Sequence, residues 1–248
     1  MIPDQPFLFY FVIGLAAFIT GLSKAGLGGA LGVLITPLVV SVMPSAQALG
    51  FTLPVLMIGD IFAMAAHWGR WEGKLLRILL PGALVGVTLG TFVLTNISSV
   101  ALRRALGIMV MVFFLYRLFE PRLRASAHLM KSRWMGLGTG ALAGFTSTLA
   151  HAGGPPVTMY LLMQNLSPRS FVATSVLFFT VLNWIKVPYY WAAGLFDFEM
   201  QLRLAWLLLA VPIGVWAGRW LTQHISKEIF DRAILLLLGI TAVWLLLE

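Results

Sequence analysis

Long apolar runs alternate with short polar intervals along the whole chain. The runs are too long for the strands of a membrane barrel, and they lack the alternation of apolar and polar side chains that such strands show. We therefore expect an all-α membrane protein, in which each bilayer crossing needs about 20 residues of helix. The expected segments lie at about 7–23, 28–43, 47–68, 75–96, 100–118, 134–150, 155–166, 169–193, 201–221 and 229–247.

The longest polar interval, 117–133, divides the chain near its middle. When the first half is shifted by about 125 residues, Gly28-Gly29 falls on Gly153-Gly154, and further glycine and proline positions match in the same order. Chance agreement among glycine-rich apolar helices is the alternative explanation. The expected organisation is one integral membrane domain with a first transmembrane repeat, a basic cytoplasmic connector and a second transmembrane repeat, at 1–120, 121–133 and 134–248.

Composition excludes most soluble classes of protein. Of the 248 residues, 60% are hydrophobic and only 10% are charged, and cysteine is absent. An ordinary soluble domain is about 45–50% apolar and about 25% charged. The chain lacks the sequence motifs of metal sites and of hydrolytic catalysis. We therefore expect no enzyme activity, no cofactor and no metal site.

The positions of the basic residues predict the topology, because Lys and Arg favour cytoplasmic loops. If each half has five segments and the connector is cytoplasmic, only Arg103, Arg104 and Arg203 fall on the outer side. Four crossings per half would divide the charges more evenly and leave Lys24 in the membrane. An odd number of segments predicts two inverted repeats of about five hydrophobic segments each, the first two forming a broken or re-entrant pair. We expect a multi-pass membrane protein with both termini on the outer side, and orientation explains the net charge of +8 without a nucleic-acid partner.

The first candidate site lies in the first two segments. Six glycines between positions 14 and 32 make an unbroken helix costly, at about 1 kcal/mol per interior glycine. A break near 26–29 would expose backbone N–H groups around Gly28 and Gly29 at the start of a half-helix, where anions bind. Ser23 adds a hydroxyl donor and Lys24 a positive charge. The alternative is close helix packing by small residues, with Lys24 extended to the cytoplasmic interface.

The corresponding stretch of the second half is 144–156. Pro155-Pro156 directly follows the glycine pair, and two prolines begin a helix but cannot continue one. A helix break is therefore expected beside a group of polar side chains. The candidate binding residues here are Thr148, His151, Gly153 and Gly154, with Thr146 and Ser147 as polar neighbours. A structural histidine without a ligand is the alternative for His151.

The third segment of each half carries ionisable residues at membrane depth. Asn183 and Lys186 share a polar face with Thr180 and Tyr190, and Asp60 is an isolated carboxylate in 47–68. A lysine at the centre of a membrane helix costs about 2.5–3.5 kcal/mol, so it faces the protein interior or a watery cavity. We expect anion coordination by Asn183 and Lys186 and a proton-coupling or gating role for Asp60 or His151. The alternative is a structural pair of Lys186 with Asp60.

These motifs resemble the TauE/SafE family of sulfite exporters. The resemblance rests on the glycine-rich break at 21–32 leading to Pro37, on its echo at 150–156 and on the short basic centre, and it spans nearly the whole chain. It implies transport of a small anion such as sulfite, sulfoacetate or another C2 sulfonate across a bacterial inner membrane, and the expected orientation then puts both termini in the periplasm. His151 and Pro155-Pro156 depart from the glycine-rich second half that is frequent in the family, which leaves the identity of the anion open.

The expected function is therefore secondary transport of a small sulfur-containing anion by alternating access, in the direction of export. The expected partners are this anion and the lipid bilayer, and oligomer formation is left open. One alternative is an anion channel. The other is a proton-coupled importer of a small organic carboxylate or sulfonate.

Overall fold

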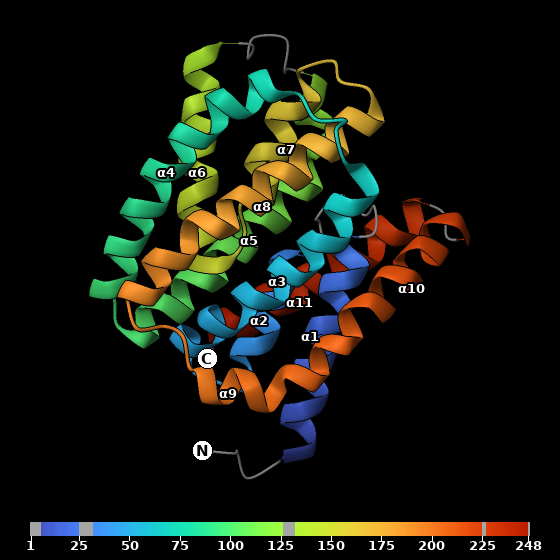
Figure 1. The fold of residues 1–248 in the computed structure, drawn as a ribbon. Helices are drawn as coiled ribbons and strands as arrows, with labels where there is room; N and C mark the ends of the chain where they lie inside the picture. The colour runs from blue at the N-terminus through green and yellow to red at the C-terminus, as the bar shows by residue number, and fades with distance from the viewer. Residues whose placement is uncertain (1–5, 25–31, 126–131, 225–226, 248) are drawn as a thin grey trace.

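The computed structural model describes residues 6–24, 32–125, 132–224 and 227–247, and helices make up nearly all of these ranges (Figure 1). The described helices are α1 (Pro6–Lys24), α2 (Gly32–Val40), α3 (Ser45–His67), α4 (Gly73–Asn96), α5 (Ser99–Ala125), α6 (Arg133–Ala150), α7 (Gly154–Leu162), α8 (Pro168–Ala192), α9 (Phe198–Leu204), the 3-10 helix η2 (Ala205–Leu209), α10 (Ala210–His224) and α11 (Lys227–Leu247).

The chain is a multi-pass membrane protein. Within the described ranges, 6 helical stretches are long and apolar enough to cross a bilayer, namely α1, α3, α4, the first part of α5, α8 and the stretch from α9 into α10. By contrast, α2 and α7 have 9 residues each. A helix of that length extends about 14 Å, roughly half of a hydrocarbon core. The expected segment at 155–166 is thus a short helix beside a longer neighbour, as a broken or re-entrant pair requires, whereas the start of the segment expected at 28–43 lies outside the described residues.

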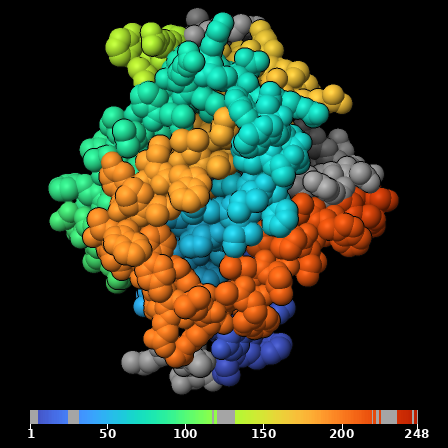
Figure 2. Space-filling view, viewed as in Figure 1, coloured from blue at the N-terminus to red at the C-terminus, as the bar shows by residue number. Residues whose placement is uncertain are grey.

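The helices pack in pairs that join the two halves of the chain. In Figure 1, α4 lies along α6 at one end of the molecule and α1 lies along α10 at the other. Between these pairs, α3 packs against α8, and α5 packs against α11. Figure 2 shows α8 in orange and α3 in cyan side by side on one face. Thus α4 packs against the first helix of the second half, α6, and α10 packs against the first helix of the first half, α1.

Glycines allow the closest of these helix contacts. A Cβ atom at Gly86 of α4 would lie 2.0 Å from the Ala141 carbonyl oxygen of α6, and one at Gly214 of α10 would lie 2.0 Å from that of Phe18 in α1. Gly21 lies inside α1 and is equally close to α10, while the break expected near 26–29 lies outside the described residues. The small-residue packing that was the alternative explanation for the first glycine-rich stretch is correct at Gly21.

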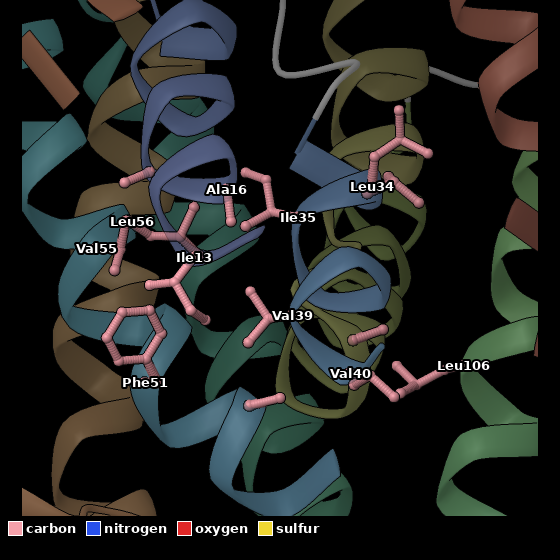
Figure 3. Close-up of a cluster of buried hydrophobic side chains, with 14 of the residues drawn as sticks. Ile13, Ala16, Leu34, Ile35, Val39, Val40, Phe51, Val55, Leu56 and Leu106 are labelled. Carbon is pink, nitrogen blue, oxygen red and sulfur yellow. The ribbon is translucent and has the colours of Figure 1, made fainter. Parts of the chain in front are cut away.

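Two main apolar clusters lie on either side of a polar interior. The larger cluster joins α1, α2 and α3 to α5, α10 and α11, and Figure 3 shows Ile35 and Val39 of α2 facing Ile13 of α1, with Phe51 of α3 beside Ile13. The second joins α4, α6, α7 and α8 around side chains such as Phe178. Because α3 and α8 lie between the clusters, their inward polar side chains meet where the two groups of helices join.

Candidate functional site

The break between α6 and α7 places polar groups in the protein interior. α6 ends at His151, whose backbone is left-handed with φ of 52°, and the His151 N–H donates to the Ser147 carbonyl at 2.9 Å. This bond from a left-handed residue to the carbonyl four positions earlier is the αL type of helix end, and the next N–H, of Ala152, donates to the Thr146 carbonyl at 3.3 Å. Pro155 and its neighbour then start α7. The predicted break is confirmed, and it holds the imidazole in place through the backbone.

Lys186 of α8 reaches this break from the opposite side. Its side chain is completely buried, and Nζ donates to Ser147 Oγ at 3.0 Å and to His151 Nδ1 at 2.8 Å. The Ser147 carbonyl oxygen lies 3.5 Å from the same Nζ atom. All of these partners are neutral groups of the α6 end. The Lys186 ammonium is therefore solvated by the chain without a counter-charge in direct contact.

The same region is tied to α3 through the backbone of that helix. The His151 Nε2 atom lies 3.2 Å from the Leu49 carbonyl oxygen. Pro54 lies inside α3 and has no N–H to offer the Gly50 carbonyl, which accepts instead from Gln201 Nε2 at 3.4 Å. Carbonyl oxygens on this turn of α3 thus accept hydrogen bonds from side chains of other elements, and Pro54 is the sequence signal for the free Gly50 carbonyl.

A second charged group connects α1, α3 and α8. Lys24 forms an ion pair with Asp60 Oδ1, and Asn183 Nδ2 donates to Asp60 Oδ2 at 2.7 Å. Asp60 is 2% exposed and the Lys24 side chain 15%. Lys24 therefore does not extend to the cytoplasmic interface, as one alternative had it. Asp60 pairs with Lys24 and not with Lys186, so the alternative of a direct Lys186–Asp60 pair is wrong.

A small cavity of about 50 Å³ lies between these two groups. One water molecule needs roughly 10–15 Å³ of cavity volume, so this cavity has room for about three or four waters or for an anion of similar size. Gly32 and Gly154, the first residues of the short helices α2 and α7, both line it. The other lining residues are Thr20, Ser23, Lys24, Ile35, Leu56, Ser147, His151, Phe179 and Asn183.

A wider groove of about 460 Å³ lies between α3 and α8. Asp60 and Thr180 line it together with apolar side chains, and Trp68 and Trp184 are exposed beside it. Asp60 does not line the small cavity, but both of its partners, Lys24 and Asn183, do. The Asp60 carboxylate thus stands between the groove and the small cavity.

The structure brings most of the predicted binding residues together. Ser23, Lys24, His151, Gly154 and Asn183 line the small cavity, and Lys186 contacts two of its lining residues. Gly28 and Gly29 lie outside the described residues.

Two predicted residues have structural roles in this conformation. The Thr148 hydroxyl donates to the Gly144 carbonyl of its own helix at 2.9 Å, and the Thr148 carbonyl accepts from Tyr190 at 2.7 Å. Gly153 is closely packed, because a Cβ there would lie 2.7 Å from the Ala143 oxygen. Neither residue is among those lining the small cavity.

The sequence reasoning missed Thr20 and Phe179 as lining residues, and it treated Ser147 only as a neighbour of the break. Thr20 lies one helical turn before Lys24 on the same face, which is a signal that could have identified it. For metals, the described ranges contain no group of three or more His, Asp or Glu side chains that could hold an ion.

Comparison with known proteins gives one result. The family model described as sulfite exporter TauE/SafE matches residues 13–245, which is nearly the whole chain. No curated protein and no solved structure matches.

Proposed function

The chain belongs to the TauE/SafE family of sulfite exporters, which are membrane transporters, and on that premise we propose that it exports a small sulfur-containing anion across the inner membrane by alternating access. The substrate class is sulfite or a C2 organosulfonate such as sulfoacetate. The binding site is the small cavity between Lys24 and the end of α6.

One observation carries this proposal: the half-buried Lys24, the fully buried Lys186 and the start of the short helix α7 converge on one cavity. Lys24 lines it directly, and Lys186 donates to Ser147 and His151, which line it. The N-terminus of a helix carries a partial positive charge and backbone donors, so it favours anions. Because Pro155 and Pro156 have no N–H, the first turn of α7 offers few backbone donors. Hydroxyl groups of Ser23 and Ser147 complete a set of donors suited to an oxyanion.

The packing of the helices supports two inverted repeats, 1–120 and 134–248, joined by the basic connector 121–133. Exchanging the halves converts the α4–α6 pair into the α10–α1 pair, and it maps α3–α8 and α5–α11 onto themselves. The glycines at two of these contacts also correspond, because a shift of about 128 residues places Gly86 on Gly214. In transporters of this plan, one group of helices rocks against the other around a fixed site.

Asp60 is placed to act in gating. Its carboxylate separates the groove from the cavity and is held by one residue from α1 and one from α8. An arriving anion competes with Asp60 for the Lys24 ammonium, and release of Asp60 would connect the groove with the cavity. Asp60 and His151 are also the candidates for proton coupling if the cycle runs toward import.

Export follows from the membrane voltage. One negative charge that leaves a cell held at about −100 mV gains roughly 2.3 kcal/mol, so export needs no coupled ion. The basic loops place the connector in the cytoplasm and both termini in the periplasm, and removing Lys24 from the count of loop charges does not change this preference.

Counterflow in proteoliposomes tests the proposal and separates a carrier from a channel. Vesicles loaded with unlabelled sulfite should transiently accumulate labelled sulfite above equilibrium, whereas a simple pore only equilibrates it. Lys186→Met should abolish the uptake. Lys74→Met, which removes an exposed lysine at the start of α4, is the matched control and should leave it intact. Equal counterflow in the two variants would disprove the assignment of the site.

A further inference from the structure

The charges buried around the cavity can be counted from the hydrogen bonds. Asp60 is negative, since one of its oxygens pairs with Lys24 and the other accepts from the Asn183 amide. Lys24 and Asp60 therefore cancel each other. What remains is the charge on His151 and Lys186, the other titratable groups at the site.

His151 is neutral in this arrangement. An ammonium group has only donors, so the Nδ1 atom that Lys186 approaches at 2.8 Å must accept. A carbonyl oxygen has only lone pairs, so the Nε2 atom 3.2 Å from the Leu49 oxygen carries the proton. Both ring nitrogens thus take part in hydrogen bonds, and the imidazole carries a single proton, on Nε2.

Lys186 is then the single unbalanced charge among the described groups at the site. Its contacts are Ser147 Oγ, the Ser147 carbonyl and neutral His151, and its side chain has no exposed surface. An unpaired charge in the interior is costly, and an opposite charge close by relieves that cost. The site as a whole holds one net positive charge and is balanced by one negative charge.

We infer that this balance selects singly charged oxyanions over doubly charged ones. The inference rests on the proposed function and narrows its substrate class. Hydrogen sulfite and simple alkanesulfonates such as methanesulfonate or isethionate carry one charge and neutralise the site. Sulfate, fully ionised sulfite and sulfoacetate carry two, and their second charge would be buried without a partner. Cavity volume points the same way, because about 50 Å³ accommodates an oxyanion head group and little more.

Methanesulfonate and sulfate provide a matched pair of probes, because both are tetrahedral with five non-hydrogen atoms and differ by one charge. Binding of each to the purified full-length protein is measured by isothermal titration at constant ionic strength. The expected result is roughly tenfold or tighter binding of methanesulfonate, a ratio that corresponds to about 1.4 kcal/mol. Isethionate against sulfoacetate repeats the comparison with two carbons.

Charge variants then test the cause. Asp60→Asn keeps an acceptor for the Asn183 amide and raises the net charge by one, so the preference should move to sulfate. Adding Lys24→Met to Asp60→Asn restores one positive charge, and methanesulfonate should again bind more tightly. Size-exclusion profiles verify that both variants are folded.

The outcomes separate the inference from the proposed function. Equal binding of the two anions to the unaltered protein, or an Asp60→Asn variant with an unchanged ratio, overturns charge selection while leaving anion transport intact. Absence of binding by every anion, together with absence of counterflow, overturns the proposed function itself. Should Asp60→Asn fail to fold, the ratio measured on the unaltered protein still decides the inference.

Discussion

The side-chain amide of Asn183 donates to the Oδ2 atom of Asp60 at 2.7 Å, with both side chains almost fully buried. This hydrogen bond joins α3 to α8, the third helices of the two halves. The other oxygen of Asp60 pairs with Lys24 of α1. One carboxylate thus links three helices, two of which belong to the first half and one to the second.

Replacing Asn183 with leucine should destabilise the protein by about 1–3 kcal/mol, because it leaves a buried carboxylate oxygen without its donor. Asn96→Leu is the control, since Asn96 is exposed at the end of α4. The measurement is the midpoint of unfolding as SDS is titrated into detergent-solubilised protein. Equal midpoints for the two variants would show that the Asn183–Asp60 hydrogen bond contributes nothing to stability.

His151 supports the site in two separable ways, through its imidazole and through its left-handed backbone. Glycine adopts a φ of 52° without strain, whereas alanine pays about 1 kcal/mol or more for it. His151→Gly and His151→Ala both remove the partner of Lys186, so both should lose anion binding. His151→Ala should in addition be less stable by about 1 kcal/mol, as judged by SDS titration. If the two variants unfold together, the backbone of the α6 end is not the constraint described above.

The crossing of α4 and α6 should be intolerant of a single methyl group at Gly86. The Cβ atom of a Gly86→Ala variant would lie 2.0 Å from the Ala141 carbonyl oxygen, and overpacking of this kind lowers the free energy of unfolding by about 1–3 kcal/mol. Gly138 lies on α6 with open space around its Cα, so Gly138→Ala should stabilise the helix by about 0.5–1 kcal/mol. Opposite shifts of the unfolding midpoint are expected for the two variants, and shifts of the same sign would refute the close contact.

Local chemistry made part of this architecture predictable. Proline lacks an N–H, so Pro155-Pro156 marked the start of a helix, and α7 begins one residue earlier, at Gly154. A lysine within a membrane helix needs polar groups around it, so Lys186 indicated which face of α8 is directed into the protein. Glycine content alone does not separate a helix break from close packing: Gly21 lies inside α1 and permits close packing against α10, whereas the break expected at 26–29 lies outside the described residues.

The hydrogen-bond and ion-pair partners of the buried polar side chains could not be predicted in the same way. Spacing along a segment tells which side chains share a face, but not which helix lies opposite. Lys186 was the only ion-pair partner considered for Asp60. However, α3 lies against both α1 and α8, and the lysine that pairs with Asp60 is Lys24 of α1. Backbone acceptors were missed for a related reason. The acceptor that faces His151 is the backbone carbonyl of Leu49, so no residue type in the sequence indicates it. Its position depends on how α6 approaches α3.

The charge balance of the site predicts that anion exchange is faster than net export. A carrier loaded with one anionic charge is neutral at the site, whereas the empty carrier must reorient with the unpaired charge of Lys186 buried. External methanesulfonate should therefore accelerate efflux of labelled methanesulfonate from proteoliposomes several-fold. The empty carrier moves its positive charge inward on the return, so the voltage acts on this step, and about 2.3 kcal/mol is available per 100 mV.

A potassium gradient with valinomycin sets the voltage for this measurement. An inside-negative potential should speed net efflux and leave exchange almost unchanged, because exchange bypasses the return of the empty carrier. The Asp60→Asn/Lys24→Met double variant keeps one net positive charge and should retain the same voltage dependence. If exchange responds to voltage as strongly as net efflux does, the loaded carrier is charged, and the count of one net positive charge at Lys186 is wrong.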